Sequence, residues 1–193
     1  MTALLRYCIE NGGFFLPYLE EFNRLYPEVV LDLDFSDRMV DLVAEGFDVA
    51  IRGAKLEDSS LISRPLCHFS FKLVAGSDYL ATAGEPKSIQ DLLNHQCLHY
   101  RYPQTGRLDD WQLPEAIVLP QSMVCNHLET LLYFVKQGKG IACIPEFCVN
   151  DGLNVVLPHI KLRQNTFHLV FPSNRYLSPK VRTFVDFMVQ AVK

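Results

Sequence analysis

The amino-acid sequence predicts an α/β fold of two lobes, and two kinds of hydrophobic period carry this prediction. Residues 29–35 alternate apolar and acidic side chains, as a half-buried strand does, whereas residues 16–26 repeat apolar side chains at helical spacing. Strands and helices of these kinds alternate along the chain, an order that is typical of parallel sheets with crossover helices. The alternation occurs in two separate series, so we expect two lobes.

The first series opens with a weakly marked strand in ALLRYCI and continues with an amphipathic helix. Pro17 falls in the first turn of this helix, where its missing N–H costs no hydrogen bond. The side chains expected on its buried face are Leu16, Leu19, Phe22, Leu25 and Tyr26.

The strand of residues 29–35 comes next, and its buried face is expected to hold its alternate apolar side chains. These are Val29, Leu31, Leu33 and Phe35. Ser36 or Asp37 is then expected to cap a second helix that ends at Gly46, and VAIR forms a further strand. The order strand, helix, strand, helix, strand completes the first α/β lobe.

The strand FSFKLVAG follows these elements, and the second series then contains the strands CLHYRY, MVC and IACI. Its clearest helix is NHLETLLYFVKQG, where Asn126 and Glu129 are expected to form a capping box and Gly138 to end the helix. Ser88 is expected to cap the short helix SIQDLLN, and Pro145 opens a helical turn after IACI.

The last helix follows the second series but has no strand partner of its own there, so we expect it to return to the first lobe. Ser178 is its expected cap, Pro179 its first residue, and its buried face holds Val181, Phe184, Val185 and Met188. The predicted first lobe therefore comprises residues 1–74 and 170–193, and the predicted second lobe residues 75–169. Two adjacent connections form a hinge, and the cleft between hinged lobes is the default ligand site.

The composition and charge of the chain argue against several classes of function. The 193 residues are 49% hydrophobic, and 18 basic against 22 acidic residues give a net charge of -4, without a basic block that would hold nucleic acid. No apolar stretch is long enough to span a membrane, and the N-terminus lacks the layout of a secretion signal, so we expect a cytoplasmic protein. Six cysteines without C-x-x-C spacing are expected to be buried, reduced thiols.

Candidate ligand-binding residues follow the predicted strands, because free backbone N–H groups and the positive ends of helix dipoles gather there. Ser36 with Asp37, and Asn126 with His127, occupy such positions, and a loop that includes Asn11 and Gly13 would complete one wall. These positions favour a polar or anionic ligand. The alternative is that each capping residue only stabilises its own helix, and the sequence leaves both interpretations open.

Tyr100 and Arg101 end a predicted strand of the second lobe. A guanidinium there could bind a carboxylate through two hydrogen bonds and a tyrosine ring could stack on it, although a surface arginine and a tyrosine at the edge of the core are the simpler interpretation. Arg52 ends the third strand and is expected either to contact a ligand or, more simply, to form a salt bridge with Asp48 or Glu57.

Pro145 and Phe147 are candidates for an apolar wall of the ligand site, with membership of the core as the alternative. His95, Cys97 and His99 alternate and so could face one side of a strand, but no fourth ligand follows at a matching spacing. We therefore expect no metal site. None of the common catalytic or cofactor-binding motifs is present, so we expect no enzyme activity and no cofactor.

The stretch FSDRMVDLVAEGFDVAIRGAKLEDSSLISRPL resembles the most recognisable part of the effector-binding domain of LysR-type transcription regulators. The resemblance continues through VAGSDYL, DLLNHQCLHYR, VCNHLETLLYFVKQGKGIACIPEF and VFPSNRYLSPKVRTFVDFM, in the family's order. It implies two Rossmann-like lobes with a hinge and a central cleft, as in type 2 periplasmic binding proteins. It also implies effector contacts at these loops, including one at Ser36.

The resemblance further implies a homodimer, in which the helix of residues 17–26 lies near residues 127–137 of the other subunit. LysR regulators carry a winged helix-turn-helix before this domain, which this chain lacks, so DNA binding and assembly to a tetramer are expected only of a full-length protein. A solute-binding protein of a transporter is the alternative function, and an enzyme that uses the cleft is another.

Overall fold

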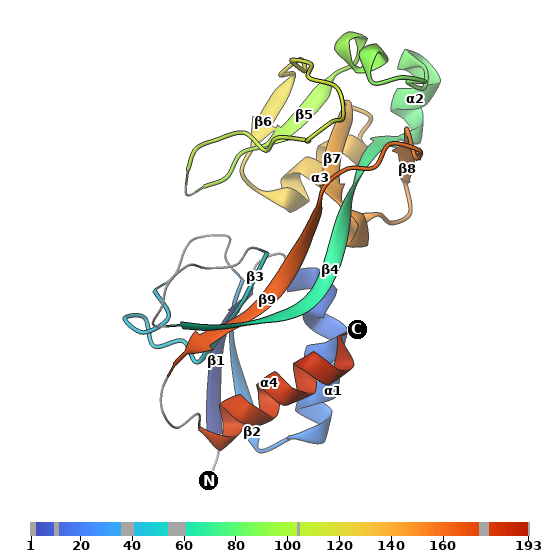
Figure 1. Cartoon of the computed structure of the whole chain (residues 1–193). Helices are drawn as coiled ribbons and strands as arrows, with labels where there is room; N and C mark the ends of the chain where they lie inside the picture. Colours follow the sequence, from blue (N-terminus) through green and yellow to red (C-terminus); the bar gives the residue numbers. More distant parts are fainter. Residues whose placement is uncertain are drawn as a thin grey trace. The chain divides into compact units, whose positions relative to one another are not determined.

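The computed structural model divides into two compact units, which are described separately. Unit 1 comprises residues 1–68 and 165–193, and unit 2 comprises residues 69–164. The chain passes from one unit to the other within strands β4 (Leu61–Gly76) and β9 (Gln164–Pro172), which are neighbours in the strand order (Figure 1). The structure describes residues 3–9, 12–35, 41–53, 61–103, 105–173 and 178–192.

Unit 1 is built on the strand order β2-β1-β3-β9-β4. Strand β1 is parallel to both β2 and β3, as expected for crossover connections, and β3 is antiparallel to β9. The other elements of this unit are β1 (Ala3–Ile9), the 3-10 helix η1 (Gly12–Phe15), α1 (Leu16–Leu25), β2 (Val29–Phe35), β3 (Val49–Arg52) and α4 (Pro179–Ala191).

Aromatic rings join α1 and α4 in the core of unit 1. The ring of Phe22 in α1 meets that of Phe184 in α4 edge to face, with centroids 5.0 Å apart, and both residues are fully buried. The predicted buried face of α4 is confirmed in full. In α1, Leu19 and Phe22 are buried, but Leu16 and Leu25, expected on the same face, are 48% and 47% exposed. The prediction was wrong for these two residues because α1 buries a narrower stripe than its apolar pattern suggests.

Strand β2 is where it was predicted, but its buried face was not. Val29 is buried, whereas Leu33 and Phe35 are exposed within the described part of the chain. β2 lies at the end of the described strand order, beside β1. Sequence alternation shows that a strand has two unlike faces, but it does not show that another element covers the apolar one.

The helix predicted to end at Gly46 is a turn at residues 42–46 in the described part of the chain. Asp41 stabilises this turn, since its Oδ1 accepts hydrogen bonds from the backbone N–H groups of Val43 (3.1 Å) and Ala44 (2.9 Å). Gly46 ends the turn with a φ of +73°, which favours glycine. The expected caps, Ser36 and Asp37, lie outside the described residues.

Unit 2 has the strand order β4-β7-β5-β6, and β8 pairs with β4. Strand β5 is parallel to β6 and β7, whereas β4 is antiparallel to β7 and β8. Besides β4, its elements are α2 (Ser77–Ala83), η2 (Gln90–Asn94), β5 (Cys97–Tyr100), β6 (Met123–Cys125), α3 (Leu128–Lys136), β7 (Ile141–Pro145), η3 (Glu146–Cys148) and β8 (Leu153–Val156).

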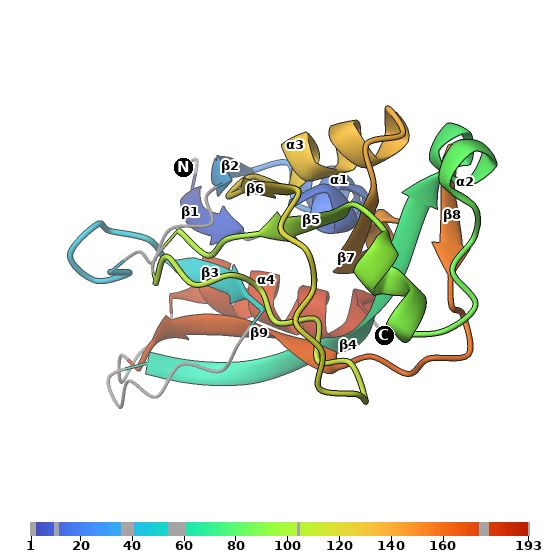
Figure 2. The same cartoon turned by 90° about the horizontal axis from the view of Figure 1, so that it is seen from above.

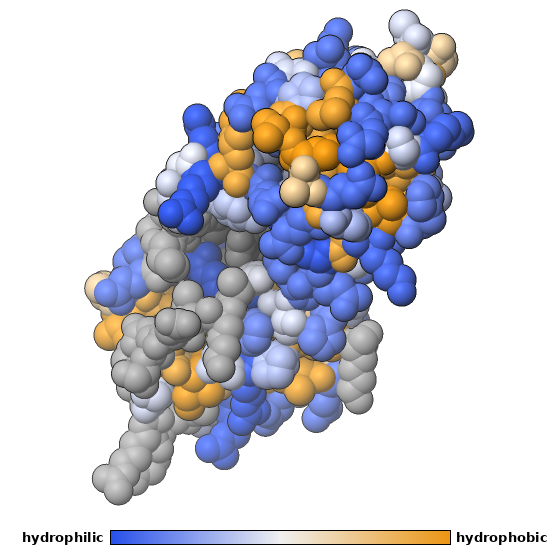
Figure 3. All heavy atoms as spheres, turned by 45° about the horizontal axis from the view of Figure 1, so that its top comes forward, coloured by the Kyte–Doolittle hydropathy of each residue, from blue (hydrophilic) through white to orange (hydrophobic). Residues whose placement is uncertain are grey.

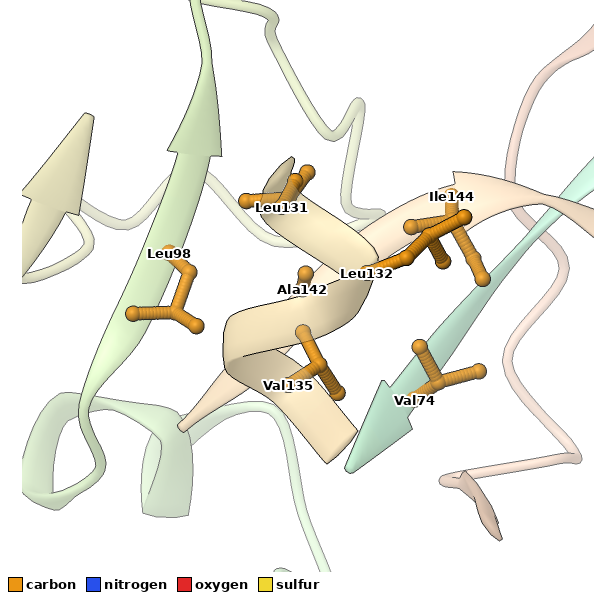
Figure 4. Close-up of a cluster of buried hydrophobic side chains, with 7 residues drawn as sticks. All are labelled: Val74, Leu98, Leu131, Leu132, Val135, Ala142 and Ile144. Carbon is orange, nitrogen blue, oxygen red and sulfur yellow. The ribbon is translucent and has the colours of Figure 1, made fainter. Parts of the chain in front are cut away.

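Helix α3 packs on one face of this sheet and forms a buried hydrophobic cluster with it (Figures 2 and 4). Leu131, Leu132 and Val135 of α3 are buried against apolar side chains of β4, β5 and β7. The helix ends as predicted at Gly138, whose φ is +68°. The Gly138 N–H donates to the Val135 carbonyl and the Lys139 N–H to the Phe134 carbonyl, which is a Schellman motif. Among the described residues, no helix is both long and apolar enough to cross a membrane.

Candidate functional site

The carboxyl ends of β5, β6 and β7 share one edge of unit 2, because these three strands are parallel. Tyr100 in β5 is paired with Cys125 in β6, and Leu98 in β5 with Ala142 in β7. Six of the predicted site residues lie at or just beyond this edge: Tyr100, Arg101, Asn126, His127, Pro145 and Phe147. We call it the carboxyl edge of unit 2.

At the end of β5, the two predicted residues differ in exposure. Tyr100 is half-buried and packs against the core beneath α3, which agrees with its simpler interpretation as a residue at the edge of the core. Arg101 is exposed, and its backbone N–H donates to the carbonyl of Cys125 at 2.7 Å. The sheet therefore holds the backbone of Arg101 while its guanidinium remains accessible.

At the end of β6, His127 caps α3. Its Nδ1 accepts a hydrogen bond from the backbone N–H of Thr130 at 3.3 Å and lies 3.1 Å from the Thr130 hydroxyl. The predicted capping box of Asn126 and Glu129 was wrong, because the extended backbone that precedes the helix is at His127 and Asn126 lies one residue earlier. A neutral His127 that accepts at Nδ1 carries its proton on Nε2, which makes Nε2 a donor.

The capping role of His127 predicts a specific pattern of stability. His127→Ala is expected to lower the free energy of unfolding by about 1 kcal/mol, because the Thr130 N–H loses its acceptor. His127→Ser keeps an acceptor at this position and is expected to lower the free energy of unfolding by only about 0.3 kcal/mol. Urea denaturation monitored by circular dichroism measures both variants. Equal destabilisation by alanine and serine would contradict the capping role.

At the end of β7, Pro145 is buried and Phe147 is half-buried, with its ring 5.4 Å from that of Phe69. Between them, Glu146 makes contacts that the sequence did not predict. Its carboxylate accepts hydrogen bonds from the backbone N–H (2.8 Å) and the hydroxyl (2.5 Å) of Ser70 in β4, which lower the pKa of Glu146. The two residues are 76 positions apart, so no local pattern could reveal the contact.

The lowered pKa of Glu146 predicts a pH dependence. A carboxylate with a depressed pKa stabilises the fold above its ordinary pKa of 4.5, and this contribution is lost as the pH falls through the folded value. Ser70→Ala is therefore expected to lower the melting temperature at pH 7 and to change it less as the pH falls below about 4. Thermal unfolding of both proteins between pH 3 and 7 tests this, and a difference that does not narrow in acid would contradict it.

Unit 1 also presents parallel strand ends at one edge. Arg52 is the last residue of β3 and is only 6% exposed, and Gly13 lies exposed in η1 after β1. Asp48, one of the two carboxylates considered as partners of Arg52, accepts a hydrogen bond from Lys180 Nζ at 2.7 Å. Asn11, Ser36, Asp37 and Glu57 lie outside the described residues.

The alternating residues His95, Cys97 and His99 make separate contacts within unit 2. The Tyr79 hydroxyl lies 3.1 Å from His95 Nδ1, and His99 Nε2 lies 2.9 Å from the carbonyl of Pro120. The Cys97 thiol donates to the carbonyl of Leu92. Within the described part of the chain, no group of three or more histidine, cysteine or acidic residues is arranged to hold a metal ion.

Free thiols are found at Cys67, Cys97, Cys125, Cys143 and Cys148. Cys97 and Cys143 are buried as expected, but Cys67, Cys125 and Cys148 are only half-buried. Burial raises the pKa of Cys97, Cys143 and Cys148 to about 12, so these thiols stay protonated at neutral pH.

The two units, each an α/β sheet with polar residues at parallel strand ends, have the features of a small-molecule-binding domain. The family model of the LysR substrate binding domain matches residues 11–193 of this chain. The chain therefore belongs to the LysR substrate-binding domain family, and the predicted fold class is confirmed by its structural neighbours.

Individual relatives agree with this assignment. The chain is 29% identical to the HTH-type transcriptional regulator CrgA of Neisseria meningitidis over 90% of its own length and 61% of that protein, so it spans about three-fifths of that relative. It is 30% identical over its whole length to the uncharacterized HTH-type transcriptional regulator YhjC of Escherichia coli, of which it covers 69%.

Solved structures agree as well. The CrgA regulatory domain superposes with a TM-score of 0.87 at 28% identity, with all of both chains covered. The full-length virulence activator AphB of Vibrio cholerae superposes with a TM-score of 0.80 at 23% identity, over all of this chain and 69% of that one, and shows a similar fold. These relatives are transcription regulators, not solute-binding proteins of transporters.

Proposed function

We propose that this chain is the effector-binding and dimerisation domain of a LysR-type transcription regulator, and that it senses a small polar or anionic metabolite. In the whole regulator, the effector would control DNA binding by a helix-turn-helix part in the cytoplasm, in a dimer or tetramer. The effector would act through its different affinities for two conformations of the domain. We expect it to be released chemically unchanged.

One observation carries the choice of ligand class: the carboxyl edge of unit 2 is rich in hydrogen-bond donors. The exposed guanidinium of Arg101, the side-chain amide of Asn126 and the first backbone N–H groups of α3 gather there. The Thr130 N–H is already bound by His127, but the N–H groups of Leu128 and Glu129 have no acceptor within the helix, and the helix dipole adds partial positive charge. Such a set of donors fits a carboxylate better than a cation.

The remaining predicted contacts complete the proposed site. Pro145 and Phe147 would supply apolar contacts beside the donors, and Tyr100 would offer the edge of its ring. The candidates of unit 1 are Asn11, Gly13, Ser36, Asp37 and Arg52, of which Ser36 matches an effector-binding position of the family.

Thermal unfolding across a library of small organic acids, amino acids, aromatic acids and sugars tests the proposal. A ligand at a hundred times its dissociation constant adds about 2.7 kcal/mol of stability, which is expected to raise the melting temperature by roughly 5–10 °C. Stabilisation by sugars but by no acid would contradict the ligand class. Mass spectrometry of the recovered ligand tests whether it is released unchanged.

The proposed site itself is tested with a matched pair of arginines. Arg101→Ala is expected to weaken binding of the identified acid at least tenfold, because it removes a charged donor. Arg107→Ala changes another exposed arginine of the same turn and is expected to leave the affinity unchanged. Equal affinities of the two variants would overturn the proposed role of Arg101.

The dimer is proposed to use α1 and α3. The surface drawn in Figure 3 is largely hydrophilic, with apolar side chains gathered in a few patches. Large apolar residues are exposed on both helices, including Leu16 and Leu25 on α1 and Tyr133 on α3. Leu25→Glu is expected to convert the dimer to a monomer in sedimentation experiments, whereas Lys87→Glu, on neither helix, is not. A dimer that survives Leu25→Glu would count against α1 as an interface.

A further inference from the structure

A buried ion pair lies close to the carboxyl edge of unit 2. Both oxygens of the Asp109 carboxylate accept hydrogen bonds from Nη2 of Arg163, at 2.7 and 2.6 Å, and the two side chains are only 4% and 9% exposed. The Tyr102 hydroxyl donates to Asp109 Oδ1 at 2.5 Å, and Arg163 Nη1 donates to the carbonyl of Asp110. The four residues form one network, which we call the Asp109 network.

The Asp109 network holds the turn that follows Arg101. This turn is closed by the bridge between Arg101 and Leu108 and by the hydrogen bond from the Tyr102 N–H to the Arg107 carbonyl at 2.9 Å. The Asp109 N–H donates a hydrogen bond to the carbonyl of Tyr100 at 2.7 Å. The side chains of Tyr102 and Asp109 thus join the two ends of the turn beneath the exposed Arg101.

Arg163 connects this turn to both strands that leave unit 2. It directly precedes β9, and its guanidinium carbon lies 3.9 Å above the centre of the Phe71 ring in β4. β4 and β9 are the segments through which the chain continues into unit 1. A displacement of the turn would therefore be transmitted to β4 and β9 through the side chain of Arg163.

We propose that Asp109 and Arg163 are positioning residues of the effector site: they fix the turn after Arg101 and transmit its displacement to β4 and β9. This inference rests on the proposed function, because Arg101 is its contact with the effector. A buried ion pair is a weak source of net stability, since desolvation offsets most of its attraction. Arg163 instead specifies a single arrangement of the turn relative to the two strands, because Nη2 binds the Asp109 carboxylate while Nη1 binds the Asp110 carbonyl.

Residue-resolved hydrogen exchange of the ligand-free chain tests this transmission. Tyr102→Phe removes one hydrogen bond of the network and is expected to speed exchange of the Gly106 and Asp109 amides about tenfold. Exchange of residues 164–168 is expected to rise several-fold, whereas the amides of Leu131 and Ile144 in the core should change less than about twofold. Tyr133→Phe, which removes a hydroxyl from an exposed tyrosine, serves as the control.

Tyr102→Phe is then made in a protein whose Arg163 is also substituted. In an Arg163→Lys background, which keeps the charge but lacks a second nitrogen to bind the Asp110 carbonyl beside the Asp109 carboxylate, Tyr102→Phe is expected to add no change at residues 164–168. Asp109→Asn provides a second background if the lysine variant does not fold.

Two results would overturn the proposal: equal acceleration at every amide, or an unchanged effect of Tyr102→Phe on residues 164–168 in the Arg163→Lys protein. Because no effector is present, these results are independent of the Arg101→Ala titration that tests the proposed function.

Discussion

Asp109→Ala is expected to lower the free energy of unfolding by about 3–5 kcal/mol, because it leaves the guanidinium of Arg163 buried without its carboxylate. Burial alone lowers the pKa of Arg163, but the hydrogen bonds and charge of Asp109 outweigh burial and raise that pKa above its ordinary value. Arginine remains protonated at pH 7, so without Asp109 its charge would be buried with no carboxylate to offset the desolvation. Urea denaturation at pH 7 measures the loss.

Two comparisons separate this effect from a general sensitivity to charge changes. Lys87→Ala breaks the exposed pair with Glu85 (2.6 Å) and is expected to cost at most about 0.5 kcal/mol. The double variant Asp109→Leu with Arg163→Met removes both charges and is expected to recover much of the loss, since apolar groups can replace a buried pair. A cost of Asp109→Ala as small as that of Lys87→Ala would contradict the prediction.

Gly140→Ala is expected to cost about 3 kcal/mol or more, because a side chain there has no room. A Cβ at this position would lie 2.3 Å from the carbonyl oxygen of Gln96, and the φ of Gly140 is +154°. The same oxygen accepts the hydrogen bond of the Ile141 N–H at 2.8 Å, next to the start of both β5 and β7. The alanine must therefore displace backbone at the start of two parallel strands.

Gly152→Ala is the matched control for this substitution. Gly152 also has a positive φ, +89°, but a Cβ there would have no neighbour within 4 Å. Its substitution is expected to cost only the backbone strain, about 1 kcal/mol. Equal melting temperatures of the two variants would contradict the prediction, because they would show that the backbone near Gln96 accommodates the added Cβ without loss of stability.

Elements with strong local periods were predicted well. The buried face of α4 and the end of α3 at Gly138 are both as expected. Both features depend on residues that are close together in the sequence, namely the helical repeat of apolar side chains and the glycine that ends the helix. The positions of Arg101 and His127 at the carboxyl edge were also predictable, since each follows a short apolar strand in a parallel series.

Predictions that depended on which neighbour covers a surface were less successful. The apolar residues Leu16, Leu25 and Phe35 were expected to be buried, yet the described fold leaves them exposed. The cap of α3 was assigned to Asn126 because Asn126 and Glu129 have the spacing of a capping box, but His127 occupies that position. In each case the local pattern was present, and a tertiary contact or a shift of one residue decided the outcome.

The sequence by itself determined the order of strands and helices, and with it the edges at which polar residues gather, because these follow from hydrophobic periods within short segments. Only the tertiary structure decided the contacts of Asp109 with Arg163 and of Glu146 with Ser70, whose partners are 54 and 76 residues apart. The physical reason is that an ion pair or hydrogen bond needs two groups within about 3 Å, and residues so distant in sequence meet only when the sheet has formed.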